Sequence, residues 1–311
     1  MTAHLLLSNH TLSNLEGSTR PGTEVKPLQQ IRELAEHYLC VATLNERLED
    51  LSRQFQQPHT RPWQRIEWHN IHPSQIVGID PVVFIAILAG AADTEDPIRG
   101  YTQTSRQYLE PLYPKMARFV GGSVDGNGKL IEIGLWEKEE RRHTPALQKL
   151  YSQLTGLQLR LLPTTPRTYQ PSGNAHTDLY RHGLHRIATE YGATCLYLWL
   201  MAHTTGPLQT VLEELLIDEI NHLTKFWGFG RWAFPDASRV TVLQTILQSA
   251  WHRQWQRDRG SSFLHTWRHM AQTLHWEAWS WANQLSFLWT LTVVLHRLQH
   301  WSNSLTPQSL T

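Results

Sequence analysis

The stretch LLIDEINHLTKF, residues 215–226, combines an apolar run with a carboxylate and a histidine three positions apart. Residues three apart lie on the same face of an α-helix, so Glu219 and His222 share one face. The apolar members of that face are Leu212, Leu215 and Phe226. The polar pair therefore occupies positions where core residues belong, and the stretch predicts a buried helix that carries polar ligands.

A second Glu-x-x-His pair, Glu140 and His143, lies in WEKEERRHTPALQKLY, residues 136–151. Its helical face continues through Ile133, Trp136, Leu147 and Leu150. About one such pair is expected by chance in a chain with 18 histidines, so the placement of the pairs carries the argument rather than their number. A buried carboxylate without a partner costs several kcal/mol. Glutamates on two core-facing stripes therefore predict a cation between the helices.

Two further glutamates stand alone on apolar helices. Glu190 is the only acidic residue between Asp178 and Glu213, and Glu95 continues an apolar stripe that begins at Phe84. The order along the chain is one contribution per helix: Glu95, then Glu140 with His143, then Glu190, then Glu219 with His222. Di-iron bundles use a Glu from each of two helices and Glu-x-x-His from the other two. Four carboxylates with two imidazoles favour iron or manganese over a structural zinc.

The chain as a whole predicts an all-α protein, with a four-helix bundle core and additional helices at both ends. Residues 1–26 are polar and aperiodic, and we expect a flexible N-terminal arm there. Helical periodicity covers residues 27–57, 79–92, 129–157, 177–204 and 206–227. The stretches 121–128 and 163–174 are glycine-rich and proline-rich and predict loops, and alternation is brief, at 129–133. We expect the bundle over residues 27–230 and a helical extension packed on it over 231–311.

These motifs resemble those of the ferritin-like di-iron carboxylate proteins, and among them the soluble acyl-acyl-carrier-protein desaturases. The resembling segments are ILAGAADTEDPIRGYTQ (87–103), WEKEERRHTPALQKLY (136–151), ATEYGATCLYLW (188–199) and LLIDEINHLTKF (215–226). The second segment reads Glu-Glu-x-x-His and the last reads Asp-Glu-x-x-His, as in that family. The resemblance covers about residues 79–227 and implies a ferritin-like bundle that holds two ions of iron, with manganese as the alternative.

The resemblance also implies a role for each ligand. Glu140 and Glu219 would bridge the two ions, and His143 and His222 would each bind one. The terminal ligands would be Glu95 and Glu190.

A second set of residues would support these ligands. Asp218 would accept a hydrogen bond from His143, and Glu139 would accept one from His222, which fixes the histidine tautomers. Thr194, one turn after Glu190, would line the oxygen side of the site.

One departure concerns Glu95. Pro97 follows it by two residues, so the helix must kink or end nearby. If the helix ends early, Asp93 or Glu110 could replace Glu95.

The implied function is that of an oxidoreductase. Two irons, reduced by an external donor such as a ferredoxin, would activate dioxygen and oxidise or desaturate an apolar, acyl-type substrate. The residues taking part would be Glu95, Glu140, Glu190, Glu219 and Thr194. Two alternatives stay open. One is a ferritin-like oxidase, ferroxidase or peroxide-consuming protein without an organic substrate, and the other is a non-catalytic helical interaction protein.

Composition argues against several other classes of protein. The charges nearly balance, 28 Lys and Arg against 27 Asp and Glu, whereas a nucleic-acid binder normally carries a basic excess. No run of 18 apolar residues exists, so we expect no membrane span. The start, MTAHLLLSNHTLSN, lacks the features of a signal peptide, and Cys40 and Cys195 cannot form a disulfide framework. A cytoplasmic protein is expected.

The C-terminal part is rich in tryptophan and histidine. Eight of the 14 tryptophans lie within residues 236–301, and we expect them to pack on the bundle or on a second copy in a homodimer. A membrane-surface role stays open because tryptophan favours interfaces. The pairs His265/His269 and His296/His300 have no carboxylate at helical spacing and are interpreted as ordinary amphipathic residues. Asp125-Gly-Asn-Gly lacks the terminal glutamate of a calcium loop and predicts a turn.

Overall fold

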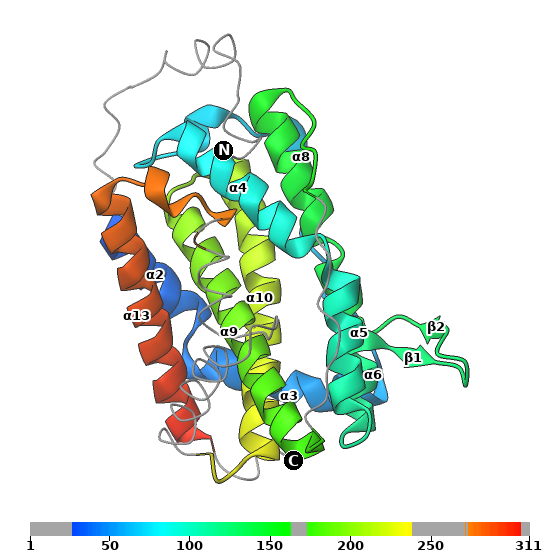
Figure 1. The fold of residues 1–311 in the computed structure, drawn as a ribbon. Helices are drawn as coiled ribbons and strands as arrows, with labels where there is room; N and C mark the ends of the chain where they lie inside the picture. The colour runs from blue at the N-terminus through cyan, green and yellow to red at the C-terminus, as the bar shows by residue number, and fades with distance from the viewer. Residues whose placement is uncertain (1–26, 163–172, 238–270, 272, 306–311) are drawn as a thin grey trace, which may run out of the picture.

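A computed structural model describes residues 27–162, 173–237, 271 and 273–305, and the regular structure of these residues is almost entirely helical (Figure 1). This confirms the predicted all-α class. The arm predicted at residues 1–26 and the pair His265/His269 lie outside the described residues. Among the described helices, none is both long and apolar enough to cross a membrane.

Two long antiparallel helices, α9 (Ala175–Ala202) and α10 (Gly206–Ala233), form the centre of the molecule (Figure 1). Helix α9 begins after Asn174, whose side chain accepts a hydrogen bond from the Thr177 amide. Helix α10 begins with proline in its first turn, where a missing N–H costs nothing. It continues to Ala233, six residues beyond the predicted end. Each helix has 28 residues and is about 42 Å long, so residues near its middle are deeply enclosed.

Helices α4 (Pro81–Glu95) and α5 (Ile98–Leu109) follow one another along the central pair. Asp80 caps α4, because its side chain accepts hydrogen bonds from the Val82 and Val83 amides. Pro97 has no N–H to continue the helix, and α4 ends at Glu95. The predicted interruption near Glu95 is therefore confirmed, and it leaves Glu95 at the C-terminal end of its helix.

The expected helix over residues 129–157 is wrong in its first part and interrupted in its middle. Strands β1 (Ser123–Val124) and β2 (Leu130–Glu132) form an antiparallel hairpin, and α7 (Leu135–Glu140) and α8 (His143–Thr155) follow. Gly122 permits the hairpin, because it has a positive φ of 76° and a Cβ there would lie 1.7 Å from the Glu132 carbonyl oxygen. Pro145 explains the interruption, since it cannot donate to the carbonyl of Arg141, four residues earlier.

The expected helix over residues 27–57 is also divided. It forms α2 (Pro27–Tyr38) and α3 (Val41–Gln56). Cys40 between them has an extended backbone, with ψ at 153°, and its Sγ lies 3.0 Å from the Thr43 hydroxyl in the first turn of α3. This local contact competes with the helical backbone bonds and starts a new helix. The remaining short helices are α6 (Pro114–Gly121), η2 (Trp68–Asn70), η3 (Pro73–Gln75) and η4 (Trp276–Ala278).

The main core lies between the central pair and the helices around it. Helix α13 (Trp281–Ser304) contributes to it from the C-terminal extension and packs along α9, α2 and α3. Trp199 of α9 stacks on Trp279 with ring centroids 4.6 Å apart, and its indole N–H donates to the Ser286 hydroxyl of α13. Trp301 is fully buried and donates to Asn45 of α3. The described residues 273–305 of the C-terminal extension thus contribute to the same core as the central helices.

Candidate metal centre

All six residues that the sequence predicted as metal ligands meet in one buried space between the helices. They form two overlapping groups. The first contains Glu95, Glu140, His143 and Glu219, and the second contains Glu140, Glu190, Glu219 and His222. Within each group the ligand atoms lie within 4.8 Å of one another. Two glutamates, Glu140 and Glu219, belong to both groups, which is the position that carboxylates shared by two ions would take.

The six candidate ligands come from five helices, and α10 supplies two of them, Glu219 and His222. Glu95 ends α4, Glu140 ends α7 and His143 begins α8, whereas Glu190 lies in the middle of α9. The break between α7 and α8 keeps the i, i+3 relation, because Arg141 and Arg142 retain right-handed helical backbone angles.

The two carboxylates considered as substitutes for Glu95 lie outside both groups. Asp93 accepts a hydrogen bond from the Leu162 amide. Glu110 is about half exposed and pairs with Arg106. The interruption at Pro97 therefore does not displace Glu95 from the cluster.

The two histidines use their ring nitrogens differently. His143 Nε2 lies 3.3 Å from Asp218 Oδ2, and His222 Nε2 lies 3.1 Å from Glu139 Oε2, so both contacts expected of Asp218 and Glu139 are present. The Nδ1 atoms turn inward, His143 toward Glu219 at 3.2 Å and His222 toward Glu140 at 2.7 Å. Neither approach has the alignment of a hydrogen bond.

Three buried atoms of this cluster lack a hydrogen-bond partner: His143 Nδ1, His222 Nδ1 and Glu219 Oε1. Buried polar atoms in proteins are nearly always paired, so three unpaired atoms in one small space indicate a missing partner. All three are lone-pair donors, and the residues around them are carboxylates. The cluster therefore fits divalent cations.

The electrostatics of the cluster point the same way. Burial, and next to it the charge of Glu140, raises the pKa of Glu95 to about 8 and that of Glu190 to about 7. Burial lowers the pKa of both imidazoles, but Glu140 and their other carboxylate neighbours outweigh it and raise the pKa of His143 and His222 well above the usual value. Without a cation, protons are thus drawn into the cluster to balance the carboxylates.

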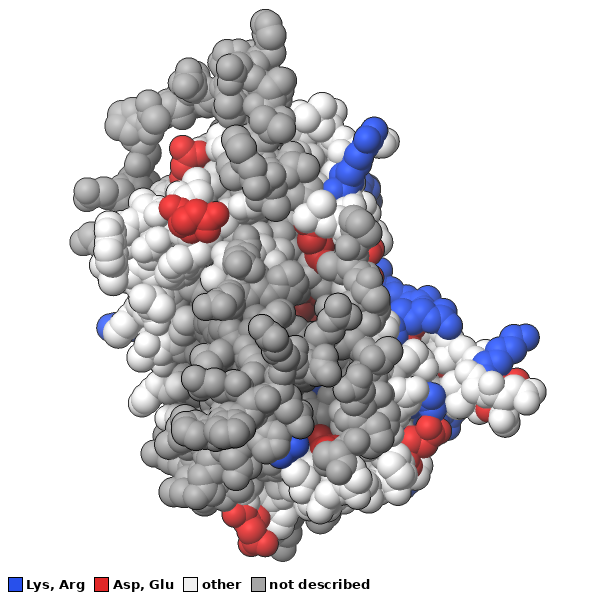
Figure 2. All heavy atoms as spheres, in the orientation of Figure 1, with Lys and Arg blue, Asp and Glu red and all other residues white. Residues whose placement is uncertain are grey.

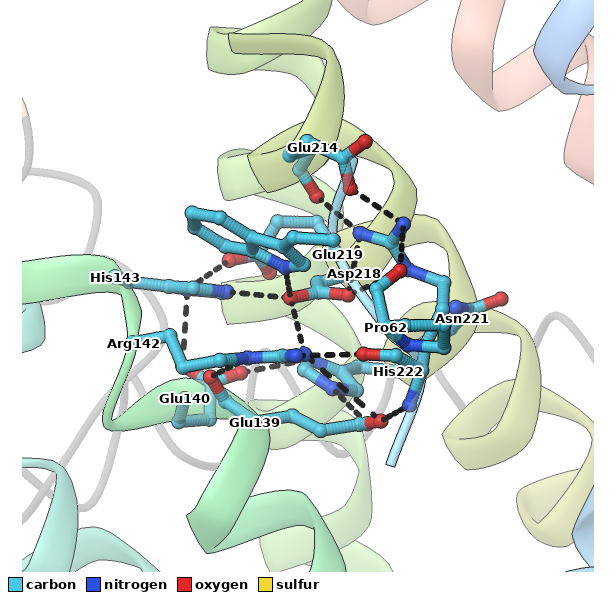
Figure 3. A network of polar contacts seen from close by, with 12 residues as sticks. Pro62, Glu139, Glu140, Arg142, His143, Glu214, Asp218, Glu219, Asn221 and His222 are labelled. Atoms are coloured by element: carbon cyan, nitrogen blue, oxygen red, sulfur yellow. Dashed lines mark hydrogen bonds and ion pairs between the residues drawn. The ribbon is translucent and has the colours of Figure 1, made fainter. Parts of the chain in front are cut away.

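Asp218 joins one ligand to the outer part of the site (Figure 3). Besides His143, it accepts hydrogen bonds from Trp63 Nε1 at 2.8 Å and from Arg142 Nη2 at 2.9 Å, both at Oδ2. Arg61 Nε donates to Oδ1 at 2.9 Å. Although burial raises its pKa, the bonds and charges of His143 and Arg61 hold the pKa of Asp218 well below its usual value. Asp218 therefore stays ionised beside the ligand.

Arg61 joins the non-helical segment after α3 to α10, to α7 and to the junction between α7 and α8. Its guanidinium pairs with Glu214 at 2.5 Å, and its backbone amide donates to Glu139 Oε1 at 2.9 Å. Its carbonyl oxygen accepts a hydrogen bond from Arg142 Nη1 at 2.6 Å. The sequence analysis missed Arg61, Trp63 and Arg142, because the first two lie in a segment without periodicity and Arg142 counts as surface charge from spacing alone.

Other buried polar groups surround the cluster. The Tyr197 hydroxyl donates to Glu95 Oε1 at 3.1 Å, and Trp136 Nε1 donates to Glu140 Oε1 at 2.9 Å. Thr194 is fully buried, and its hydroxyl has no hydrogen-bond partner among the described residues. It lies one turn after Glu190 in α9.

Arg186, one turn from Glu190 in the other direction, places a buried positive charge next to the carboxylates. Its guanidinium carbon lies 5.4 Å from the Tyr101 ring centre and 6.0 Å from that of Trp136. The charge of Arg186 acts to lower the pKa of Glu190, against the effect of burial. The sequence analysis did not identify Arg186 as a neighbour of the cluster, because it is one of several basic residues in the first half of α9.

No protein-family model, curated protein or solved structure matches the chain. The geometry of the cluster and of its outer partners is the ground on which a function can be argued.

Proposed function

We propose that this chain is a ferritin-like, di-iron oxidoreductase that activates dioxygen and oxidises or desaturates an apolar, acyl-type substrate. The observation that carries the proposal is the meeting of two unpaired imidazole Nδ1 atoms and four carboxylates in one buried space. Two divalent cations would supply the positive charge that four carboxylates and two neutral imidazoles require. Oxygen and nitrogen ligands in this ratio suit iron, and manganese next.

The six ligands divide naturally between two ions. Glu140 and Glu219 would contact both, because each belongs to both groups of ligand atoms. Bound iron would supply the redox chemistry with dioxygen, with electrons from an external donor such as a ferredoxin.

The outer residues would hold the ligands in place. With Asp218 and Glu139 accepting from Nε2, each imidazole keeps its proton there and offers Nδ1 to the cluster. Tyr197 holds one oxygen of Glu95. Thr194, whose buried hydroxyl has no hydrogen-bond partner among the described residues, would line the oxygen side of the site.

The substrate class is supported by the apolar residues around the cluster. The helical faces that carry the ligands continue into side chains that are fully buried: Leu88, Leu147, Leu150, Leu215 and Leu216. Such walls exclude water from the ions and favour a hydrocarbon over a polar molecule. The apolar, acyl-type substrate is proposed on this ground.

Metal analysis of protein made in iron-replete medium is the first test. We expect two iron ions per chain, and we expect Glu140→Gln to lose most of the metal while its helical circular dichroism stays unchanged. Glu110→Gln is the matched control, because it removes a carboxylate near the end of α5 that lies outside the cluster. An intact fold without metal would contradict the proposal and would favour the non-catalytic interaction protein.

The reaction is tested with the iron-loaded protein, a reduced ferredoxin, dioxygen and a saturated long-chain acyl group. The acyl group is offered as the free acid and as the acyl-carrier-protein thioester. Mass spectrometry should show loss of two hydrogens or gain of one oxygen. Dioxygen consumption without any organic product would contradict the substrate assignment and favour the ferroxidase or peroxide-consuming alternative.

A further inference from the structure

Helix α13 has two apolar faces, and the core uses only one of them. The inner face packs on the neighbouring helices through Phe287, Val294, Leu298 and Trp301. The opposite face presents large apolar side chains to solvent: Trp281 is 77% exposed, Leu285 57%, Leu288 49%, Leu295 40% and Trp289 39%. Single exposed apolar residues are common on proteins, but a continuous row of them marks an interaction surface.

The spacing of this outer row is regular. Positions 281, 285, 288, 292 and 295 follow one another in steps of four, three, four and three, and Thr292 is the only polar member. This is the 3.5-residue repeat of a coiled-coil seam. We call these five residues the α13 stripe. Helix α13 does not need the stripe to pack against the core, because a different set of its residues faces the core.

Charge decides between possible partners. The only Lys, Arg, Asp or Glu in α13 is Arg297, which pairs with Glu36 of α2 at 2.8 Å. Part of the edge of the molecule where α13 lies in Figure 1 is drawn grey in Figure 2, and the described residues visible along the rest of it are mostly uncharged. A helix that lies on an anionic membrane would carry Lys and Arg beside its apolar face, and α13 has none there. An uncharged stripe meets an identical stripe without repulsion.

We propose that a second copy of this chain covers the α13 stripe, with the two α13 helices antiparallel about a two-fold axis beside Leu288. Trp281 and Leu295 each lie seven residues from Leu288, so the axis brings the two Leu288 side chains together. It also places Trp281 of one copy against Leu295 of the other. This interface is independent of the metal chemistry, and it lies outside the segments that carry the ligands.

The area that the stripe offers is small for a specific interface. The exposed apolar side chains of the stripe and Trp289 offer on the order of 500 Å² per copy, so a pair buries roughly 1,000 Å², the lower end for a specific interface. The dimer should therefore dissociate in the micromolar range rather than persist at every concentration.

The test measures the mass of the full-length protein by light scattering and sedimentation between about 1 and 100 μM. We expect the mass to rise from 36.1 kDa toward twice that value. Leu288→Glu and Leu288→Lys should each raise the dissociation constant at least tenfold, because each places two like charges at the axis. An equimolar mixture of the two variants should restore the dimer. Asn303→Glu, an exposed position beyond the stripe, is the matched control and should change nothing.

Circular dichroism and melting temperature of each variant separate loss of pairing from loss of fold. A wild-type protein that stays monomeric at the highest concentration overturns the proposal, as does a dimer that tolerates both charged variants. Vesicles of phosphatidylcholine and phosphatidylglycerol give the other decisive outcome. A monomer that binds them through Leu288 would show that the stripe contacts lipid instead of a second copy.

Discussion

Replacing Asp218 with asparagine tests whether the outer hydrogen bonds hold the ligands in position. Asp218 receives donors on both oxygens: Arg61 on Oδ1, and Trp63, Arg142 and His143 on Oδ2. Asparagine keeps one oxygen and replaces the other with an NH₂ group, which faces donors and cannot accept from them. The donors that faced the replaced oxygen lose their acceptor, and the donors of the remaining oxygen lose the negative charge.

The expected magnitude follows from these contacts. A hydrogen bond to a charged group contributes about 1.5–3 kcal/mol. Arg61 and Arg142 are about one-quarter exposed, so water replaces part of what they lose. We expect the free energy of unfolding to fall by about 2–3 kcal/mol. Loss of the partner of a metal-binding histidine should weaken iron binding about 10- to 100-fold, which is about 1.4–2.7 kcal/mol.

Two measurements and one control separate these effects. Anaerobic titration with Fe²⁺ gives the affinity, and urea unfolding followed by circular dichroism gives the stability. Glu214→Gln is the control, because Glu214 pairs with the same Arg61 but contacts no ligand. It should lower stability while leaving iron affinity within about threefold. The reasoning is refuted if Asp218→Asn binds iron as the wild type does, or if Glu214→Gln weakens binding equally.

Three further predictions concern the rest of the fold. Truncation after Pro235 should give an aggregated or unfolded product, because it removes the inner face of α13 from the core; a soluble, helical product in gel filtration would show a separable extension. Gly90→Ala should lower the free energy of unfolding in urea by about 1–3 kcal/mol, because the new Cβ would lie 1.9 Å from the Thr273 carbonyl oxygen. Gly183→Ala is the control and should be neutral or stabilising, because the space around Gly183 is open. Burial lowers the pKa of His182 well below its usual value, so below about pH 6.5 the unfolded chain takes up a proton that the folded chain excludes, and stability falls as pH falls. His182→Gln should remove up to about 1.4 kcal/mol per pH unit of that fall, measured by urea unfolding at a series of pH values.

Local spacing identified most of the side chains that meet in the cluster, whereas the choice of Glu95 also rested on the pattern of one contribution per helix. Glu219 with His222 and Glu140 with His143 lie on apolar faces, and a polar group at a core position stands out without knowledge of the partner helix. The lone Glu190 stands out for the same reason. These are signals within a single helix, and the sequence therefore predicted the members of the cluster.

Helix interruptions were harder to predict, because periodicity passes through them. The faces of α7 and α8 keep one spacing across Arg141 and Arg142, and only Pro145 reveals the break through its missing N–H. The hairpin before α7 left a brief alternation in the sequence, but the helical pattern that follows it is stronger.

The contacts of the segment that carries Arg61 left no local signal in the sequence. Arg61 bonds Asp218 across 157 residues, from a stretch that has no regular structure. The two faces of α13 could not be separated either, because apolar residues lie on both and only burial tells them apart. Such features follow from packing and cannot be read from one segment.

The distribution of the candidate ligands along the chain also determines when the cluster can first be complete. Glu95 is made long before His222, and at ordinary rates of translation the ribosome needs roughly 6–25 s to add the residues between them. Until α10 has left the ribosome, the nascent chain contains only some of the six residues of the cluster. A metal that needs all six residues would therefore enter only after α10 has emerged, and the time available for a wrong ion to enter would begin only then.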